Sequence, residues 1–507
     1  MSDERVAALL RSAHPLVVIE APAGCGKTYQ GAQYAHDIAD SLGEGRLLIL
    51  THTHAACDVF SNKTVGAGRR VEVKTIDALI GQIVKAYRRT LGLPDDPSLW
   101  ALQNDAFGIL ADKAAALLNH QPSIASSLAR RYPIIICDEH QDCTLSQHEV
   151  ILALHNAGSR LRIFGDPLQR IYGTRTDAAI AHDWDRWDRL KASGESDLLT
   201  VPHRWNRNGD PQLGAWVQRA RLCLQQNRPI DLNDRLPASV RIISAYNQAQ
   251  TRSGYQVSRD HRRPIDEVKN RHDQLMIMAS NNDLTVSLRA FWGRRIPIWE
   301  GHTRKYLPGF IQSLSDHEGN PESIAVAIIN FMGNVSIGCT QNSHGNRLCR
   351  EIRTGCIKPA RGMPGQLQVM AKVLIAKPNH EGAAECLEYL KDLIKRRETG
   401  FAGIKIDQWS EFFDAIRLGA FEDAASGYAE LSQKRTLLKP KPAEKTISTV
   451  HKSKGMECDN AMIVMGKGGD FSRTHYSRCK LYVALSRAQK SLTIVLPTRE
   501  PCRLFIT

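Results

Sequence analysis

A short glycine-containing run near the start constrains the fold of this chain more than any other feature. The apolar run LVVIE (16–20) predicts a buried strand, APAGCGKT (21–28) follows directly, and the next residues suit a helix. This order matches a phosphate-binding loop, whose backbone N–H groups turn inward around phosphate oxygens. Lys27 would add charge and the Thr28 hydroxyl could ligate Mg²⁺. The alternative, a glycine-rich turn without a ligand, is disfavoured by the flanking strand and helix, although Ala21 replaces the usual first glycine.

The residues expected to surround the phosphates and the nucleotide on this side are Ala23, Gly24, Cys25, Gly26, Lys27, Thr28 and Tyr29.

Apolar, branched runs alternate with helical stretches over much of the chain. The first series falls at 16–20, 46–50, 71–75, 133–137, 161–165 and 198–201. The second series falls at 240–244, 275–279, 296–299, 446–450, 461–465 and 492–496. Strands that alternate with helices predict parallel, doubly wound sheets, whose ligands bind at the carboxyl ends of the strands. We therefore expect an α/β fold with two such domains and an inserted, mostly helical segment.

The domain limits follow from these two series. The first α/β domain is expected at 1–190, with a short insertion at about 86–128. The second is expected to combine 191–302 with 441–507, on either side of an inserted domain at 303–440. A chain of 507 residues is long enough for this number of domains.

Charge and composition narrow the class of partner. The chain has 67 lysines and arginines against 53 acidic residues, a net charge of +14, which favours a polyanion such as nucleic acid. A basic protein that is merely soluble is the alternative. No apolar run approaches the roughly 18 residues of a membrane span and the start lacks a leader pattern, so we expect a cytoplasmic protein without a membrane partner.

Twelve cysteines are scattered without a CxxC pair, which is typical of reduced thiols. A zinc site is the alternative for one stretch, although its spacings are looser than those of most structural zinc sites. Its ligands would be Cys339, His344, Cys349 and Cys356.

Two adjacent acids follow the strand expected at 133–137. Asp138 is suited to hold Mg²⁺, and Glu139 can orient and deprotonate a water that attacks the γ-phosphate of a nucleotide. An acidic surface loop is the alternative, but it leaves Gln141 and Asp142 unexplained.

The run DEHQD (138–142) resembles the DExQD motif of UvrD/Rep-type superfamily 1 DNA helicases, and other runs resemble further motifs of that family in the same order. They are LTHTHAA (50–56), KTIDAL (74–79), FGDPLQRIYGTR (164–175), LLTVPHRW (198–205), TVHKSKGMEC (449–458) and LYVALSRA (481–488). The resemblance implies two RecA-like P-loop NTPase domains that bind ATP and Mg²⁺ in the cleft between them.

The resemblance also implies catalytic roles. Gln169 would sense the γ-phosphate, while Arg204 and Arg487 would reach it from the opposite domain; a surface salt bridge is the alternative for each arginine. The expected catalytic residues are thus Lys27, Asp138, Glu139, Gln169, Arg204 and Arg487.

The rest of the nucleotide is expected to contact three further residues as well as Tyr29. By resemblance, Gly455 and Glu457 line the cleft, and His203 stacks on the base with help from Tyr29. The family's adenine-reading glutamine has no counterpart, because no Gln occurs in the fifteen residues before the first strand.

DNA-binding residues are implied in the same way. Related motors stack bases on aromatic residues at positions that His52, Tyr172 and Thr174 occupy here, so we expect a weaker grip on single strands. A purely structural role is the alternative for other matching positions. Those positions are Thr53, Thr75, Asp77, Arg175 and His451.

Three arginines of the inserted segment recur at every third residue. Arg347, Arg350 and Arg353 would therefore share one helical face. This face could track DNA phosphates, dock an acidic partner protein or simply be solvated.

The leading hypothesis is an ATP-dependent DNA translocase or helicase, with 3′ to 5′ polarity by resemblance, in DNA repair or antiphage defence. The alternative is a DNA-stimulated ATPase subunit that signals to a partner enzyme and unwinds little. A compact chain with an EAPAGCGKT loop also resembles the helicase-like subunits of Gabija antiphage systems, whose partner is a nuclease. A binding module without ATPase activity is disfavoured because the expected catalytic residues are all present.

Overall fold

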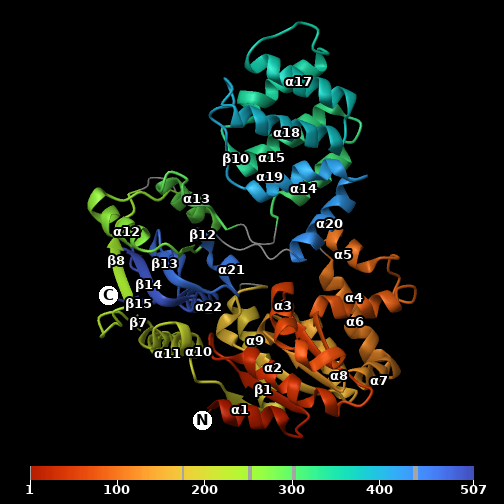
Figure 1. The fold of residues 1–507 in the computed structure, drawn as a ribbon, viewed down its shortest axis with the longest axis vertical. Coiled ribbons are helices and arrows are strands. Elements are labelled where there is room, and N and C mark those ends of the chain that lie inside the picture. Colours follow the sequence, from red (N-terminus) through yellow and green to blue (C-terminus); the bar gives the residue numbers. More distant parts are fainter. Residues whose placement is uncertain (1, 105, 174–175, 249–253, 300–303, 438–442) are drawn as a thin grey trace. The chain divides into compact units, whose positions relative to one another are not determined.

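Two compact units make up the chain in the computed structural model (Figure 1). The structure describes residues 2–104, 106–173, 176–248, 254–299, 304–437 and 443–507. One unit comprises residues 1–297 and 442–507, and the other comprises residues 298–441. Within the described ranges, no helix is both long and apolar enough to cross a membrane.

The first unit contains a six-stranded parallel sheet in the order β3-β2-β4-β5-β1-β6. Its strands are β1 (Leu16–Glu20), β2 (Leu47–Thr51), β3 (Val71–Thr75), β4 (Ile134–Cys137), β5 (Arg160–Gly165) and β6 (Glu195–Leu198). β1, β2 and β4 are buried along their whole length, which is typical of parallel strands with helices on both faces. The accompanying helices are α1 (Ser2–Arg11), α2 (Lys27–Ile38), α3 (His54–Lys63), α4 (Ile76–Ala86), α5 (Pro97–Asn104), α6 (Phe107–His120), α7 (Pro122–Arg131), α8 (Leu145–Asn156) and α9 (Asp177–Ser193).

The last strand of this sheet lies elsewhere than expected. Residues 198–201 were expected as a strand, but β6 covers Glu195–Leu198 and pairs with β1. β6 is an edge strand with largely exposed, polar residues. No apolar run therefore marks its position in the sequence. The first α/β domain therefore extends past residue 190, its expected limit.

The short insertion expected at about 86–128 has no core of its own. Helices α5 to α7 fill the chain between α4 and β4. Leu110, Ala114 and Leu118 of α6 belong to the same buried cluster as Leu48 and Ile135 of the sheet. These helices are thus part of the first domain's core.

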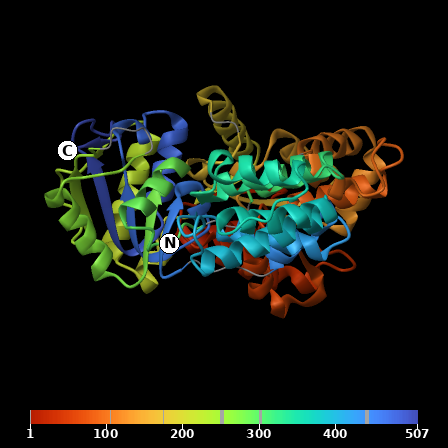
Figure 2. The same ribbon diagram turned by 90° about the horizontal axis from the view of Figure 1, so that it is seen from above.

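The same unit contains a second parallel sheet, in the order β12-β9-β13-β14-β8, with helices on both sides (Figure 2). Its strands are β8 (Val240–Ala245), β9 (Leu275–Ala279), β12 (Lys445–Thr449), β13 (Cys458–Val464) and β14 (Ala488–Pro497). Its helices are α10 (His203–Asn208), α11 (Pro211–Gln225), α12 (Arg259–Arg271), α13 (Asn282–Phe291), α21 (Val450–Ser453) and α22 (His475–Leu485). A small pair, β7 (Ile230–Asp231) and β15 (Phe505–Ile506), lies outside this sheet.

The expected strand at 296–299 is absent. This segment forms only an isolated bridge at Ile298, because Pro297 has no N–H to offer a ladder. The Pro297 carbonyl still accepts a hydrogen bond of 2.9 Å from the Ile447 N–H. The α/β fold class with two parallel sheets is nevertheless confirmed.

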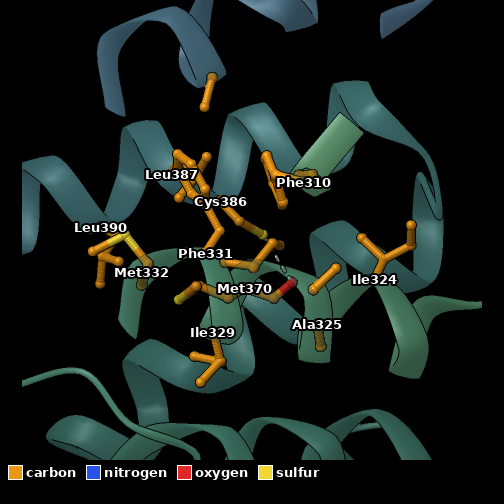
Figure 3. Close-up of a cluster of buried hydrophobic side chains, with 14 of the residues drawn as sticks. Phe310, Ile324, Ala325, Ile329, Phe331, Met332, Met370, Cys386, Leu387 and Leu390 are labelled. Atoms are coloured by element: carbon orange, nitrogen blue, oxygen red, sulfur yellow. Dashed lines mark hydrogen bonds between the residues drawn. The ribbon is translucent and has the colours of Figure 1, made fainter. Parts of the chain in front are cut away.

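The second unit is mostly helical, as expected of the inserted segment. Its elements are α14 (Leu307–Asp316), α15 (Pro321–Val335), β10 (Ser336–Ile337), α16 (Asn346–Arg353), α17 (Met363–Ala376), α18 (His380–Lys395), β11 (Lys405–Ile406), α19 (Trp409–Arg417) and α20 (Ala424–Leu437). Apolar side chains of several helices form its own core, in which the Phe310 and Phe331 rings stack 4.4 Å apart (Figure 3).

Buried charges of α19 fix the first residues of this unit. The Glu411 carboxylate accepts hydrogen bonds of 2.7–2.9 Å from the backbone N–H groups of residues 305–307. Arg304 pairs with Asp414 at 2.7 Å, and both side chains are buried. These contacts hold the start of α14 against α19.

Cys339, His344, Cys349 and Cys356 do not form a metal-binding group. Among the described residues, no group of three or more potential ligands could hold a metal ion. The His344 ring instead contacts the Ser343 hydroxyl and the Gly400 carbonyl.

Candidate nucleotide site and DNA track

The phosphate-binding loop connects β1 to α2, and its glycines are required by geometry. Gly24 and Gly26 have positive φ values of 75° and 86°, a region that glycine adopts without strain. A Cβ on Gly24 would lie 2.8 Å from Arg204 Cβ, and one on Gly26 would lie 3.1 Å from the His203 ring. The start of α10 thus packs directly against the loop.

Lys27 lies between two carboxylates that are far from it in the sequence. Its Nζ donates to Glu139 and lies 3.5 Å from Asp138 Oδ1. Gln141 also donates to Glu139. Glu139 has a φ of 54°, a left-handed conformation that is unfavourable for a non-glycine residue and frequent at functional sites. Three of the residues expected to be catalytic therefore form one cluster.

Burial and mutual contacts set the charge states in this cluster. Burial would raise the pKa of Glu139, but Lys27 and Lys454 hold it well below its usual range. At Asp138, burial raises the pKa to about 6 despite the charge of Lys27. Burial would lower the pKa of Lys27, but Asp138 and Glu139 raise it. The cluster thus holds a lysine cation and a firmly ionised Glu139, while Asp138 titrates closer to neutrality.

The residues present fit a divalent cation. Asp138 Oδ1 is buried and accepts no hydrogen bond, and a carboxylate oxygen is a preferred ligand of Mg²⁺. Thr28, in the first turn of α2, offers a hydroxyl on the adjacent loop. Thr28 and Asp138 are the residues that would hold the ion.

Two residues of the loop are engaged by the second α/β domain. The Ala23 N–H donates to the Tyr482 hydroxyl at 2.9 Å. The Cys25 thiol contacts Gln218, and burial raises the pKa of Cys25 to about 12. Neither contact was anticipated from the sequence, since both join residues far apart in the chain.

Gln169 belongs to a polar network behind the loop. Its amide donates to Asp166 Oδ2 at 3.0 Å. Arg221 of α11 donates to the other oxygen of Asp166 at 2.9 Å and to Glu20 at 2.6 Å. This buried triad joins the two α/β domains. Sequence reasoning missed it, and the only signal was a charged residue, Glu20, that ends an apolar strand.

Arg204 and Arg487 come together in the second α/β domain. Arg204 donates to Glu457 at 2.6 Å and to the Ser486 carbonyl at 2.7 Å. Arg487 donates to the Ser486 hydroxyl at 2.7 Å and to two backbone carbonyls of its own domain. Burial and the charge of Arg204 lower the pKa of Arg487 to about 10. Gly455, close to Glu457 in the chain, has a φ of 80°.

His203 and Tyr29, the expected base-stacking residues, are near unexpected partners. His203 Nε2 lies 2.5 Å from an Asp3 carboxylate oxygen, and Gln30 donates to the Asp3 carbonyl at 3.4 Å. Tyr29 is 51% exposed, with the Arg207 guanidinium 5.8 Å from its ring centre. No sequence motif marks Asp3, because only the fold brings it to His203, 200 residues further along the chain.

Three residues expected to contact DNA have structural roles. The Thr53 hydroxyl caps the N-terminus of α3 by accepting a backbone hydrogen bond of 3.2 Å, and the Thr75 hydroxyl caps α4 at 3.1 Å. Asp77 accepts a hydrogen bond of 2.8 Å from Gln147. Each of the three side chains therefore has a structural partner, and their contact with DNA stays a prediction.

Tyr172 retains the features of a stacking residue. Its ring is 43% exposed, its hydroxyl donates to the His451 carbonyl at 3.3 Å, and Lys454 Nζ lies 4.9 Å from its centre. Thr174 and Arg175, the other residues expected in this part of the track, lie outside the described residues.

Both histidines of the expected track contact protein groups. The His451 ring stacks on Tyr476 with a centroid distance of 5.8 Å and also bonds to its hydroxyl. His52 Nε2 lies 3.3 Å from Cys143 Sγ.

In the second unit, the three arginines lie on α16 as expected, but two have carboxylate partners. Arg347 pairs with Glu351 at 2.5 Å, and Arg353 pairs with Glu322 through contacts of 2.7–3.0 Å. Arg350 is exposed to solvent. A surface role of this helix therefore rests chiefly on Arg350.

Two parallel α/β domains in one unit, with a phosphate-binding loop and an acidic pair at the carboxyl ends of the first sheet, define a P-loop NTPase of two RecA-like domains. Residues 96–180 match the UvrD/REP helicase N-terminal domain, and residues 446–495 match the UvrD-like helicase C-terminal domain. In these two segments the chain is thus similar to helicases of the UvrD/Rep type. No curated protein matches it.

Proposed function

We propose that this chain is an ATP-dependent DNA translocase of the UvrD/Rep type that hydrolyses ATP between its two α/β domains. One observation supports this most. Lys27, Asp138 and Glu139 form a partly buried charged cluster on the first domain, and Arg204, which belongs to the second domain, donates its backbone N–H to the phosphate loop at Gly24.

Nucleotide binding would rearrange this cluster. The γ-phosphate competes with Glu139 for Lys27, because one ammonium group cannot pair fully with both anions. Once Lys27 has turned to the phosphate, Glu139 loses the contact that holds its pKa low and becomes a better acceptor for the proton of the attacking water. Mg²⁺, held by Thr28 and Asp138, would neutralise charge on the phosphates.

The arginines would act from the other side. Arg204 and Arg487 are held by Glu457 and Ser486, and we propose that they turn to the γ-phosphate when the domains close. An arginine in that position stabilises the charge of the transition state and raises the catalytic rate by about 10³- to 10⁵-fold. Domain closure and reopening would then move one DNA-contacting surface relative to the other.

The partner and polarity belong to the same proposal. A net charge of +14 and the exposed Tyr172 ring support binding of single-stranded DNA. Movement from 3′ to 5′ and a cytoplasmic role in DNA repair or antiphage defence are proposed by resemblance.

A second candidate is a DNA-stimulated ATPase subunit that activates a partner nuclease, as in Gabija-type systems, and unwinds little itself. The observation in its favour is that α5 to α7 share the core of the first domain. They provide no separate module for strand separation at that position. The exposed Arg350 would be one residue for docking an acidic partner.

One experiment tests both candidates. ATPase rates with and without single-stranded DNA are measured together with single-turnover unwinding of duplexes that carry a 3′ or a 5′ tail, with Lys27→Ala as the inactive control. DNA stimulation with unwinding of long 3′-tailed duplexes supports the translocase. DNA stimulation without unwinding supports the subunit. An ATPase that ignores DNA contradicts both.

A further inference from the structure

One side-chain contact joins the expected DNA track to the catalytic acids. His52 follows β2, in the run that resembles a DNA-contacting motif, and is partly exposed. Its Nε2 lies 3.3 Å from the sulfur of Cys143. Cys143 directly follows the run 138–142, which contains Asp138 and Glu139. The Cys143 sulfur therefore connects His52 to the segment that contains these two acids.

The backbone of Cys143 is held firmly on both sides. Its N–H donates to the His140 carbonyl at 3.0 Å, which closes the short helical turn η3 (His140–Asp142). Its carbonyl accepts a hydrogen bond of 2.8 Å from Arg186. These hydrogen bonds tie Cys143, whose side chain is buried, to the turn that follows Glu139.

The neighbouring residues make that turn sensitive to displacement. Asp142 bonds to Lys454 of the second domain at 2.5 Å. Glu139, at the start of the turn, has its left-handed φ of 54°, a conformation that persists only while its surroundings enforce it.

The contact is electrostatically strong. Burial would raise the pKa of Cys143, but hydrogen bonding with Cys137 and the charge of His52 lower it to about 6. Burial would lower the pKa of His52, but Cys143 and Asp142 raise it to about 9. Each group thus favours the charged form of the other, which strengthens the contact between them.

We propose that the His52–Cys143 contact transmits DNA occupancy to the catalytic acids, so that Cys143 is a positioning residue for Glu139. This inference rests on the proposed function. A base that stacks on His52 moves the imidazole, the sulfur follows, and the turn η3 re-aims Glu139 toward the attacking water. The coupling is a free-energy difference between two states of one turn, and such couplings are commonly worth 5- to 150-fold.

The test measures ATPase rate against the concentration of single-stranded DNA, which gives a maximal stimulation and a half-activating concentration. Cys143→Ala should lower the maximal stimulation at least about fivefold, with a half-activating concentration within about twofold of wild type. His52→Phe retains a ring that can stack on a base but cannot pair with the sulfur, and it should lower the maximal stimulation similarly. The double variant should be no worse than either single variant.

Cys57→Ser is the matched control, because its thiol contacts Thr51 beside the same segment without contacting the acidic turn. It should keep the wild-type stimulation. Cys143→Ser covers the possibility that the alanine variant does not fold, and should give an intermediate value because a hydroxyl pairs more weakly with the imidazole.

The outcomes separate this inference from the proposed function. A wild-type protein that DNA does not stimulate overturns the proposed function. A stimulated wild type whose Cys143 and His52 variants are stimulated equally overturns only the relay. A rise in half-activating concentration at unchanged maximal stimulation also overturns it, because Cys143 would then shape DNA binding.

Discussion

The cluster of Lys27, Asp138 and Glu139 and the two helix-capping threonines expected to contact DNA lie in the same unit of the protein but differ in the roles of their side chains. Lys27, Asp138 and Glu139 are held by one another, and Asp138 Oδ1 has no hydrogen-bond donor. Thr53 and Thr75 each cap a helix in the ordinary way. No structural role explains the first set of residues, whereas helix capping explains the second set.

The two sets of motif residues differ in what their side chains stabilise. A group of opposite charges is expensive to desolvate, and in this cluster the buried Asp138 Oδ1 accepts no hydrogen bond, which favours a site for a charged ligand. A threonine that caps a helix stabilises the fold whether or not DNA is present. Substitutions should therefore remove chemistry without much loss of stability in the first region, and do the reverse in the second.

The largest effect is expected at Arg487. Arg487→Ala should lower the maximal ATPase rate by about 10³ or more, with a much smaller change in nucleotide affinity, because the guanidinium acts on transition-state charge. Steady-state ATPase kinetics and nucleotide titration measure the two quantities. Arg473→Ala, an exposed arginine of the same domain, is the control. A change confined to affinity would contradict the assigned role.

The next effect concerns the general base. Glu139→Gln should lower turnover by about 10² to 10⁴, the usual contribution of a positioned base. Nucleotide should bind at least as tightly as to wild type, because the amide competes less for Lys27. Lys27→Ala should lose both turnover and binding. Calorimetric titration with a nonhydrolysable analogue separates the two variants, and more than about a tenth of wild-type activity in Glu139→Gln would exclude it as the base.

A smaller effect tests the other side of the comparison. Thr75→Ala removes the cap of α4 and should lower the free energy of unfolding by about 1 kcal/mol, while Thr75→Ser keeps the cap and the stability. DNA affinity should differ little between the two variants. Urea unfolding and fluorescence anisotropy with labelled single strands measure these quantities. Equal stability with a clear loss of affinity in Thr75→Ala would show that the hydroxyl serves DNA.

The sequence predicted those parts of the site that are continuous in the chain. The phosphate loop and the acidic pair each follow a buried strand directly, so a local pattern reveals them. The triad of Arg221, Glu20 and Asp166 joins residues that only the tertiary fold brings together. No periodicity or motif marks such a contact.

The strands show the same limit. Fully buried strands such as β1 and β4 are apolar over most of their length and were predicted correctly. β6 is polar and exposed at the edge of its sheet, so hydrophobicity pointed to the residues after it. The apolar segment at 296–299 looked like a strand, but Pro297 cannot donate to a neighbour, and the ladder does not form.

The smallest effect is expected on α16 of the second unit, where the same comparison applies within one helix. Both Arg350 and Arg353 are exposed, but Arg353 is paired with Glu322. If this helix touches DNA, Arg350→Ala should reduce the magnitude of the slope of log affinity against log salt by about 0.7, the value for one phosphate contact on a single strand. Arg353→Ala should leave the slope unchanged, because its charge is already paired, and it serves as the matched control. Anisotropy titrations at several salt concentrations provide the slopes.

An unchanged slope in Arg350→Ala would exclude DNA contact at this residue and favour either a docking face for an acidic partner or a solvated surface. If Arg350→Ala leaves the slope unchanged but no longer activates a partner nuclease, the result favours a docking face. If nuclease activation is also unchanged, it favours a solvated surface.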